Sequence, residues 1–162
     1  MFIYSVRAST LRVVGFALLA LVLTVGLLLS GQSGVVSAMS TATEVDYSGV
    51  KTKEDRIAFV ERFGLKVDPD SEVEEAFRMP ENFDRVILGY NELQKKQGLD
   101  LSKYRNKKVT RYTYRVTNYR TDGEVYVNLF IHRSRVVSCD IVSANPEGFV
   151  LPLTLVSKEN LK

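Results

Sequence analysis

Residues 107–143 read KKVTRYTYRVTNYRTDGEVYVNLFIHRSRVVSCDIVS, and this stretch decides the fold. It favours three consecutive strands, Lys108–Tyr119, Glu124–His132 and Arg135–Ser143, because β-branched and aromatic residues dominate it and Gly123 marks a turn. In the middle strand apolar residues occupy every second position, and such side chains lie on one face of a strand. The stretch therefore predicts an antiparallel sheet with one buried face and one wet face.

Segments before this sheet complete the predicted fold. A helix begins at Thr52, where a capping-box pattern occurs, and ends before Gly64. Glu72–Met79 fits a short edge strand, and residues 80–98 carry an apolar stripe at helical spacing. This order predicts an α+β domain in which two amphipathic helices pack on one face of a four-stranded antiparallel sheet, an arrangement analogous to the cystatin-like folds.

Two further predictions concern residues 149–156 and Gly89. Residues 149–156 are apolar enough to dock against the sheet, and a short last strand is one way to do so. Gly89 lies inside the second helix, where glycine costs about 1 kcal/mol relative to alanine. Close packing is the expected reason for that glycine.

Another apolar stretch precedes the domain. Residues 13–29 read VVGFALLALVLTVGLLL, without a charge, and they follow Arg7 and Arg12. A spanning helix needs about 20 apolar residues and its basic flank remains in the cytoplasm, so we expect a transmembrane anchor within residues 1–30. A signal peptide cleaved near Ala38 is the alternative.

The chain that follows the apolar segment is predicted to consist of a linker and one domain. Residues 31–51 are rich in Ser, Gly, Ala and Thr and predict a flexible linker, and residues 52–162 form the α+β domain. Both interpretations of the N-terminus place this domain outside the cytoplasm. The chain is then either a single-pass protein of the cell membrane with a cytoplasmic N-terminus, or a secreted protein.

Basic and aromatic residues are concentrated before and within the first predicted strand. Residues 93–120 hold nine Lys and Arg residues and a single acid. Arginine interleaved with tyrosine can bind anionic chains, and nucleic acid is an unsuitable partner outside the cytoplasm. The competing interpretation is a solvated, charged strand face. The candidate surface for an anionic lipid, a phosphate-bearing wall polymer or an envelope protein consists of Lys107, Lys108, Arg111, Arg115 and Tyr119.

Residue types suited to catalysis or to metal binding are sparse. The one cysteine, Cys139, excludes an intrachain disulfide and a thiolate zinc cluster, and we expect a buried thiol. The one histidine, His132, lies at a predicted strand end, where a surface or strand-capping role is expected rather than catalysis. Asp68–Glu72 lacks the glycine and spacing of an EF-hand, and there is no phosphate-binding glycine loop. We therefore assign no catalytic, metal or cofactor-binding residue, and no cofactor.

Several short motifs occur together in this chain. They are VDYSGVK at 45–51, EDRIAF at 54–59, YNELQK at 90–95, DLSKY at 100–104 and RYTYRVTNY at 111–119. Together they resemble a bacterial family, domain-of-unknown-function family 4830, whose members are small envelope-facing proteins, over about residues 45–150. The resemblance implies an extracytoplasmic location and a shared fold, and it supplies no catalytic residue.

The chain departs from the family pattern in two places. The family has a glycine in the turn that His132–Arg135 occupy here, and it has small glycines before the aspartate that matches Asp140. Ser138 and Cys139 replace those glycines. A role that depends on close backbone approach at these positions is therefore not carried over to this chain.

The sequence predicts a non-enzymatic, membrane-anchored accessory module that presents its sheet to a protein or anionic envelope partner. The alternative is a small enzyme or a ligand carrier with a pocket between helix 80–98 and the sheet. A filled interior would favour the accessory module. A pocket of several hundred Å³ with converging polar groups would favour the alternative.

Overall fold

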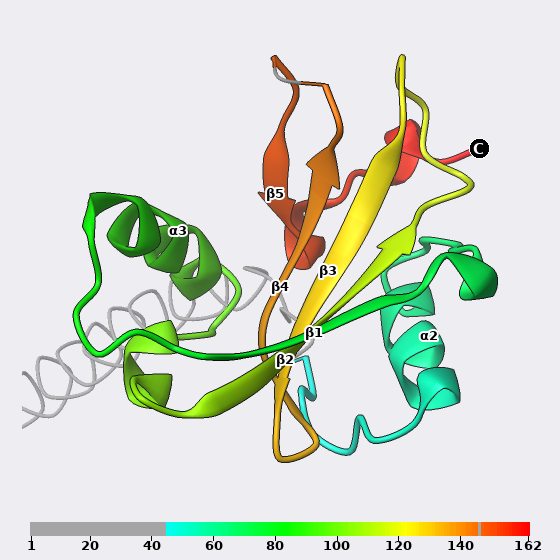
Figure 1. The fold of residues 1–162 in the computed structure, drawn as a ribbon. Coiled ribbons are helices and arrows are strands. Elements are labelled where there is room, and N and C mark those ends of the chain that lie inside the picture. The colour runs from blue at the N-terminus through cyan, green and yellow to red at the C-terminus, as the bar shows by residue number, and fades with distance from the viewer. Residues whose placement is uncertain (1–44, 146) are drawn as a thin grey trace, which may run out of the picture. The chain divides into compact units, whose positions relative to one another are not determined.

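The computed structural model describes residues 45–145 and 147–162, and Figure 1 shows their fold. Within these ranges no helix is long and apolar enough to cross a membrane. The predicted anchor at residues 13–29 and the cleavage site near Ala38 lie outside the described residues. The helices are α2 (Lys53–Glu61) and α3 (Arg85–Lys95), and the strands are β1 (Val73–Arg78), β2 (Lys108–Arg115), β3 (Val125–His132), β4 (Arg135–Ser143) and β5 (Val150–Pro152).

The strands form one antiparallel sheet in the order β1-β2-β3-β4-β5. The sheet has five strands rather than the predicted four, because β5 pairs with β4 through Ile141 and Leu151. β2 is shorter than predicted and ends at Arg115. Val116 still donates its backbone N–H to Val125 O of β3 at 2.8 Å, and Thr117 then donates its own to Lys66 O at 2.8 Å.

The sequence pattern at Thr52 starts α2 as expected. The Thr52 hydroxyl accepts a hydrogen bond from the Asp55 N–H at 3.2 Å, and the Asp55 carboxylate accepts one from the Thr52 N–H at 2.9 Å. This reciprocal pair satisfies two backbone donors that the first helical turn leaves open. Phe59 and Val60 on α2 are fully buried.

α3 begins later than the apolar stripe suggested. Its N-cap is Asp84, whose carboxylate accepts a hydrogen bond from the Ile87 N–H at 2.8 Å, so residues 80–84 precede the helix. The buried residues of α3 are the polar Asn91 and Gln94. Gly89 is exposed and has no atom within 4 Å of the place where a Cβ would stand, so the close packing expected there is wrong.

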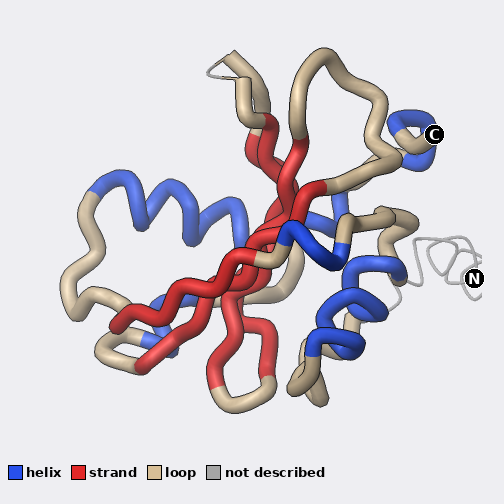
Figure 2. Tube along the Cα trace, turned by 45° about the vertical axis from the view of Figure 1, so that its right-hand side comes forward, coloured by secondary structure: helices blue, strands red, loops and turns tan. Residues whose placement is uncertain are grey.

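The two helices contact opposite faces of the sheet, as both views show (Figure 1, Figure 2). Tyr112 is adjacent to Arg111 in β2, and Arg111 pairs with Phe130 of β3 and shares its face, so Tyr112 and Phe130 lie on opposite faces. Arg56 of α2 lies 3.7 Å from the centre of the Tyr112 ring. Tyr90 of α3 packs against Phe130 with ring centroids 6.1 Å apart. The prediction that both helices pack on one face is therefore wrong.

Each face of the sheet has its own buried side chains, and for this reason the two helices do not share one face. Val109 and Tyr114 are both fully buried on β2, and their spacing of five residues directs them to opposite faces. Val109 belongs to an apolar cluster with Met79, Leu101 and Val137. Tyr114 faces α2 instead. The sheet is covered on both sides over part of its area and open elsewhere.

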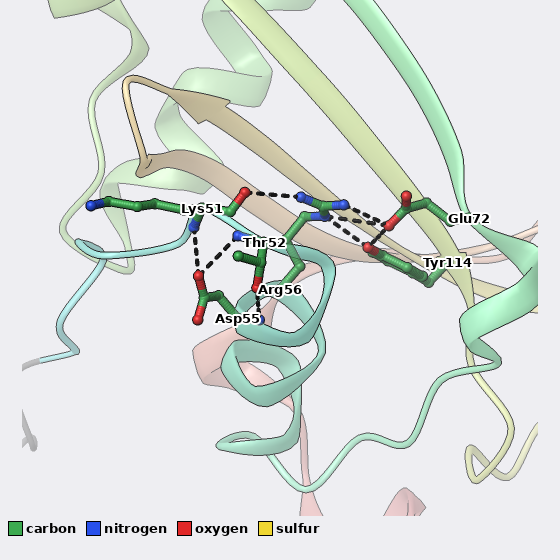
Figure 3. A network of polar contacts seen from close by, with 6 residues as sticks. All are labelled: Lys51, Thr52, Asp55, Arg56, Glu72 and Tyr114. Carbon is green, nitrogen blue, oxygen red and sulfur yellow. Dashed lines mark hydrogen bonds and ion pairs between the residues drawn. The ribbon is translucent and has the colours of Figure 1, made fainter.

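A polar network fastens α2 to the sheet (Figure 3). Arg56 Nε donates to the Tyr114 hydroxyl at 2.8 Å, and Arg56 Nη2 forms an ion pair with Glu72 at 2.9 Å. The Tyr114 hydroxyl also donates to the Glu72 carboxylate. The Arg56 side chain is only 8% exposed, so its charge requires these partners.

Three different segments cover the outer edge of β4. Near the β3–β4 turn, Val136 donates its N–H to Tyr47 O at 2.8 Å. At the middle of the strand, the Cys139 N–H donates to Gln94 Oε1 at 3.1 Å and Gln97 Nε2 donates to Cys139 O at 2.6 Å. Beyond Cys139, β5 takes over as the neighbour. The edge therefore keeps partners along its length although β5 is short.

The segment before α2 belongs to the folded domain. Tyr47 and Val50 are buried, and the Val50 N–H donates to Ser134 O at 3.0 Å. The compact unit that contains the sheet begins at Asp46. The domain therefore extends upstream of Thr52, where the sequence had placed its start.

Candidate functional site

The structure separates the five residues of the predicted anionic-partner surface. Arg111 forms an ion pair with Glu75, and Arg115 forms one with Asp68 at 2.6 Å. Tyr119 is buried, with 8% of its surface exposed. These three residues therefore do not form a free cationic surface, and the two lysines at the start of β2 are what remains of the set.

The two lysines line a hollow of about 460 Å³ at one end of the sheet. This basic hollow lies where β1 and β3 end and β2 begins, and its lining contains no acidic residue. Four of its residues carry a permanent positive charge at neutral pH. The lining consists of Arg78, Asn106, Lys107, Lys108, Thr110, Ile131, His132 and Arg133.

Three separate chain segments supply the cations. Arg78 is the last residue of β1 and pairs directly with Lys108 of β2. Arg133 is the first residue after β3. Within the described ranges, none of the four cations that line the hollow belongs to an ion pair. Like charges that face each other across two strands destabilise a sheet, so this arrangement has a cost in stability.

Two hydrogen bonds hold the walls of the basic hollow. Arg78 Nη1 donates to Asn106 O at 2.6 Å, which leaves the other guanidinium N–H groups available. His132 Nδ1 lies 2.7 Å from Lys108 O and donates to it. The His132 ring also packs edge-on against Tyr104, with centroids 5.7 Å apart. His132 thus has the strand-end role expected from the sequence.

The backbone at this end of the sheet includes unfavourable conformations. Asn106, Arg133 and Ser134 have φ values of 59°, 48° and 63°, in the left-handed region that residues other than glycine rarely adopt. Asparagine tolerates that region better than most residues, whereas Arg133 and Ser134 make the β3–β4 turn without a glycine. The turn is therefore not optimised for stability.

Arg78 and Arg133 were not among the predicted surface residues, because neither lies within the basic segment at residues 93–120. Arg78 was assigned to an acidic edge strand, and its place depends on the register with β2. A signal was nevertheless present. The Arg133-Ser134 turn lacks the Asn-Gly or Asp-Gly pair that a tight hairpin favours. This departure indicates that the turn residues have a role other than stabilising the hairpin.

A second cavity, of about 280 Å³, lies between α3 and the sheet, where the alternative hypothesis placed a pocket. Its lining is almost entirely apolar, so the converging polar groups expected of an enzyme are not found in it. We call it the α3 cavity. It is lined by Phe77, Arg78, Met79, Pro80, Ile87, Tyr90, Leu101 and Phe130.

Tyr90 connects the α3 cavity to a buried carboxyl group. Its hydroxyl donates to one oxygen of Asp140, and Asn128 Nδ2 donates to the other oxygen at 2.9 Å. Burial raises the pKa of Asp140, and the hydrogen bonds from Tyr90 and Asn128 act in the opposite direction. Burial also raises the pKa of Tyr90. Tyr90 and Asp140 therefore form a hydrogen-bonded pair inside the fold, in which burial disfavours the ionised form of both groups.

Cys139 is free and fully buried, and burial raises the pKa of its thiol. Such a thiol is a poor nucleophile and metal ligand, in agreement with the expected inert role. Within the described part of the chain, no group of three or more His, Cys, Asp and Glu side chains is placed to hold a metal ion.

The architecture defines a small α+β domain with a buried cluster on each face of its sheet and a basic hollow at one end. Residues 59–140 match the family described as Domain of unknown function (DUF4830), and the chain belongs to this family. Comparison with curated proteins and with solved structures gave no significant match. The matched range includes every residue that lines the basic hollow and the α3 cavity.

Proposed function

We propose that this protein is a non-enzymatic accessory module, held at the outer side of the cell membrane by residues 13–29, that binds an anionic envelope partner through its sheet. The observation that carries the proposal is the basic hollow, whose lining holds Arg78, Lys107, Lys108 and Arg133 and no acid. Positive charge without acidic neighbours attracts anions at long range and holds them at short range.

The non-enzymatic part of the proposal rests on where the reactive residue types lie. Cys139 is buried in β4 and carries a raised thiol pKa. His132 lies at the end of β3, and its Nδ1 is occupied by Lys108 O. Asp140 is enclosed by Tyr90 and Asn128. No pair of these groups is arranged as nucleophile and base within hydrogen-bond reach.

The partner is proposed from its chemistry. Anionic lipid headgroups and phosphate-bearing wall polymers carry negative charge, which complements the positive charge of the hollow. A membrane anchor would keep the domain close to both. An acidic surface of an envelope protein is the other partner that fits. Nucleic acid is not proposed, because the expected location is outside the cytoplasm.

Vesicle co-sedimentation of residues 45–162, which include the compact unit from Asp46 onward, tests the proposal. We expect binding to phosphatidylglycerol vesicles at low salt, loss of binding as salt rises, and no binding to phosphatidylcholine. Lys107→Glu with Lys108→Glu should abolish it. The matched control changes the exposed Lys66 and Lys158 to Glu, with the same change in net charge. Equal loss in both variants would show that overall charge, and not the hollow, is responsible.

The proposed location needs its own measurement. A reporter fused behind Lys162 should be active outside the cytoplasm, whether the N-terminal segment remains as an anchor or is cleaved near Ala38. Extraction of the full-length chain with the membrane fraction distinguishes an anchored protein from a secreted one. A reporter active only in the cytosol would contradict the proposed location and partners.

The α3 cavity favours a second candidate function, a carrier of a small apolar ligand. Apolar cavities of roughly 150 Å³ stay dry and bind benzene-sized molecules, and the α3 cavity has about 280 Å³. In this function Phe77, Ile87 and Phe130 would contact the ligand. A Met79→Trp substitution should fill the space and remove binding of an apolar fluorescent probe, and unchanged binding would reject this candidate.

A further inference from the structure

The basic hollow holds more cationic side chains than a single small anion needs. Its volume of about 460 Å³ lies within the range of small-molecule sites. Four cations come from the end of β1, the start of β2 and the turn after β3, so they surround the space from different segments. An anion that uses all of them must carry charge at several points.

The chemistry of the walls favours phosphate. Arg78 and Arg133 each present a planar fork of N–H groups that matches phosphate oxygens, and the two lysines add compact charges. Arg78 is already oriented by its 2.6 Å bond to Asn106 O, so little freedom is lost when a ligand binds. Thr110 supplies a hydroxyl group in the lining.

Unfavourable local structure is retained at the same place. Arg78 faces Lys108 across the β1–β2 pair, and Arg133 and Ser134 have positive φ values. Each feature costs stability, and each would be relieved by an ordinary substitution. Positions where several local rules are broken together are expected at functional sites. The positive φ values are independent of the charge count.

We propose that the basic hollow is a binding site for an anion that carries two or more linked phosphate groups. The inference rests on the proposed function, because it names the chemical class of the anionic partner at the same site. Arg78 and Arg133 bind phosphate oxygens through paired N–H donors, and Lys107 and Lys108 neutralise the neighbouring phosphate. A cardiolipin headgroup, in which two phosphates are linked through a glycerol, and a phosphate-bearing polymer share this chemistry.

The test uses the full-length chain in phosphatidylcholine nanodiscs, titrated calorimetrically with sodium tripolyphosphate. We expect saturable binding. Lys108→Gln should weaken it roughly tenfold or more, as expected for the loss of a charge-assisted contact. The matched control, Lys66→Gln with Lys158→Gln, should change the affinity by less than about twofold, since these exposed lysines lie outside the hollow and act only through screened charge.

A turn variant separates binding from folding. Arg133→Asn combined with Ser134→Gly gives the turn the residue pair that a two-residue hairpin favours, so its melting temperature should rise. Its affinity for tripolyphosphate should nevertheless fall roughly tenfold or more, because the Arg133 guanidinium is lost. A variant that is more stable and still binds like the wild type would overturn the inference.

The source of the phosphate is resolved by changing the nanodisc. If lipid headgroups occupy the hollow, cardiolipin nanodiscs should lower the affinity for tripolyphosphate more than nanodiscs given equal negative charge by a fatty acid. Equal affinities in the two discs assign a soluble or polymeric phosphate. Both results support phosphate chemistry at the site.

Three further outcomes overturn the inference. Loss of affinity in the control variant equal to that in Lys108→Gln would show non-specific charge attraction. Absence of tripolyphosphate binding, while residues 45–162 still sediment with anionic vesicles through Lys107 and Lys108, would overturn the phosphate assignment and leave the proposed function in place. Absence of both kinds of binding would reject both.

Discussion

Gln94 Oε1 lies 3.1 Å from the backbone nitrogen of Cys139 and accepts its hydrogen bond, so a helix side chain takes the position that a neighbouring strand would normally occupy. The same oxygen accepts a hydrogen bond from Gln97 Nε2 at 2.7 Å. Both glutamines are buried. This pairing explains why Gln94 is buried on α3, whereas Val86 and Leu88 on the same helix remain exposed.

Gln94→Met should destabilise the domain by about 1 kcal/mol. Methionine keeps the volume but leaves the Cys139 N–H without an acceptor, and a buried donor without a partner costs about 1–3 kcal/mol. We expect the lower value, because Gln94 Nε2 has no partner among the described residues and its removal offsets part of the loss. Urea unfolding measures the total, and amide exchange at Cys139 should quicken. Glu92→Gln on the exposed side of α3 is the control, and an equal effect there would contradict this role.

Glu72→Gln should destabilise the domain by about 1–3 kcal/mol at pH 7, because it leaves the Arg56 charge with a weaker acceptor. Burial alone would raise the pKa of Glu72, but the hydrogen bonds from Tyr114 and Arg56 outweigh burial and lower it. A lowered pKa means that the stabilisation is present above the unfolded value of about 4.3 and is lost as the pH falls through the folded value. The difference between wild type and variant should therefore shrink in acid.

Chemical unfolding at pH 7 and pH 3 checks this expectation, with the exposed Glu61→Gln on α2 as control. Tyr114→Phe should cost about 1 kcal/mol, because Arg56 then keeps Glu72 as its acceptor. If Glu72→Gln were neutral at pH 7, the network would not be what fastens α2 to the sheet.

Asp140→Asn should stabilise the domain at neutral pH. Burial raises the pKa of Asp140, so the folded state holds this proton more tightly than the unfolded state does. The carboxyl group therefore reduces stability as the pH rises from about 4, its unfolded value, through the folded value. Asparagine does not titrate. Its oxygen can accept from Asn128, and its amide can donate to Tyr90, whose own proton turns to Ser138 Oγ at 2.8 Å.

Unfolding free energies of this variant at pH 4 and pH 8 test the sign. The advantage over wild type should be present at pH 8 and small at pH 4. The exposed Asp122→Asn, which removes a solvated carboxylate, should show no such dependence. A variant less stable than wild type at pH 8 would show that the ionised carboxylate is favoured by its partners in spite of burial.

The sheet could be predicted because apolar and polar residues alternate along its strands, and this alternation distinguishes the buried face from the exposed face. Val125, Val127 and Leu129 alternate and are buried on β3 as expected. On β2, Tyr112 and Tyr114 alternate with polar residues and indicate one buried face, whereas Val109 is buried on the other face. A single apolar residue of opposite phase is too weak a signal to reveal a second covered face, and so the helices were placed on one side.

Lys107 and Lys108 could be predicted as candidate residues because charge density is visible along the chain. The basic hollow as a whole could not, because Arg78 reaches Lys108 only through the β1–β2 register, and Arg133 reaches it through the β3–β4 turn. Arg111 and Arg115 were lost from the site for the same reason. Their acidic partners, Glu75 and Asp68, are distant in sequence.

Gly89→Ala should stabilise the domain by about 0.5–1 kcal/mol. Gly89 lies inside α3, is exposed, and has open space where a Cβ would stand, so alanine adds helix propensity without a clash. Gly64→Ala is the matched contrast. Gly64 has a φ of 79°, and a Cβ there would lie 2.8 Å from the Leu161 side chain, so alanine should destabilise the domain. Thermal unfolding of both variants separates the two cases. A loss of stability in Gly89→Ala would show that the helix needs the flexibility of glycine at this position, because neither packing nor backbone conformation requires it.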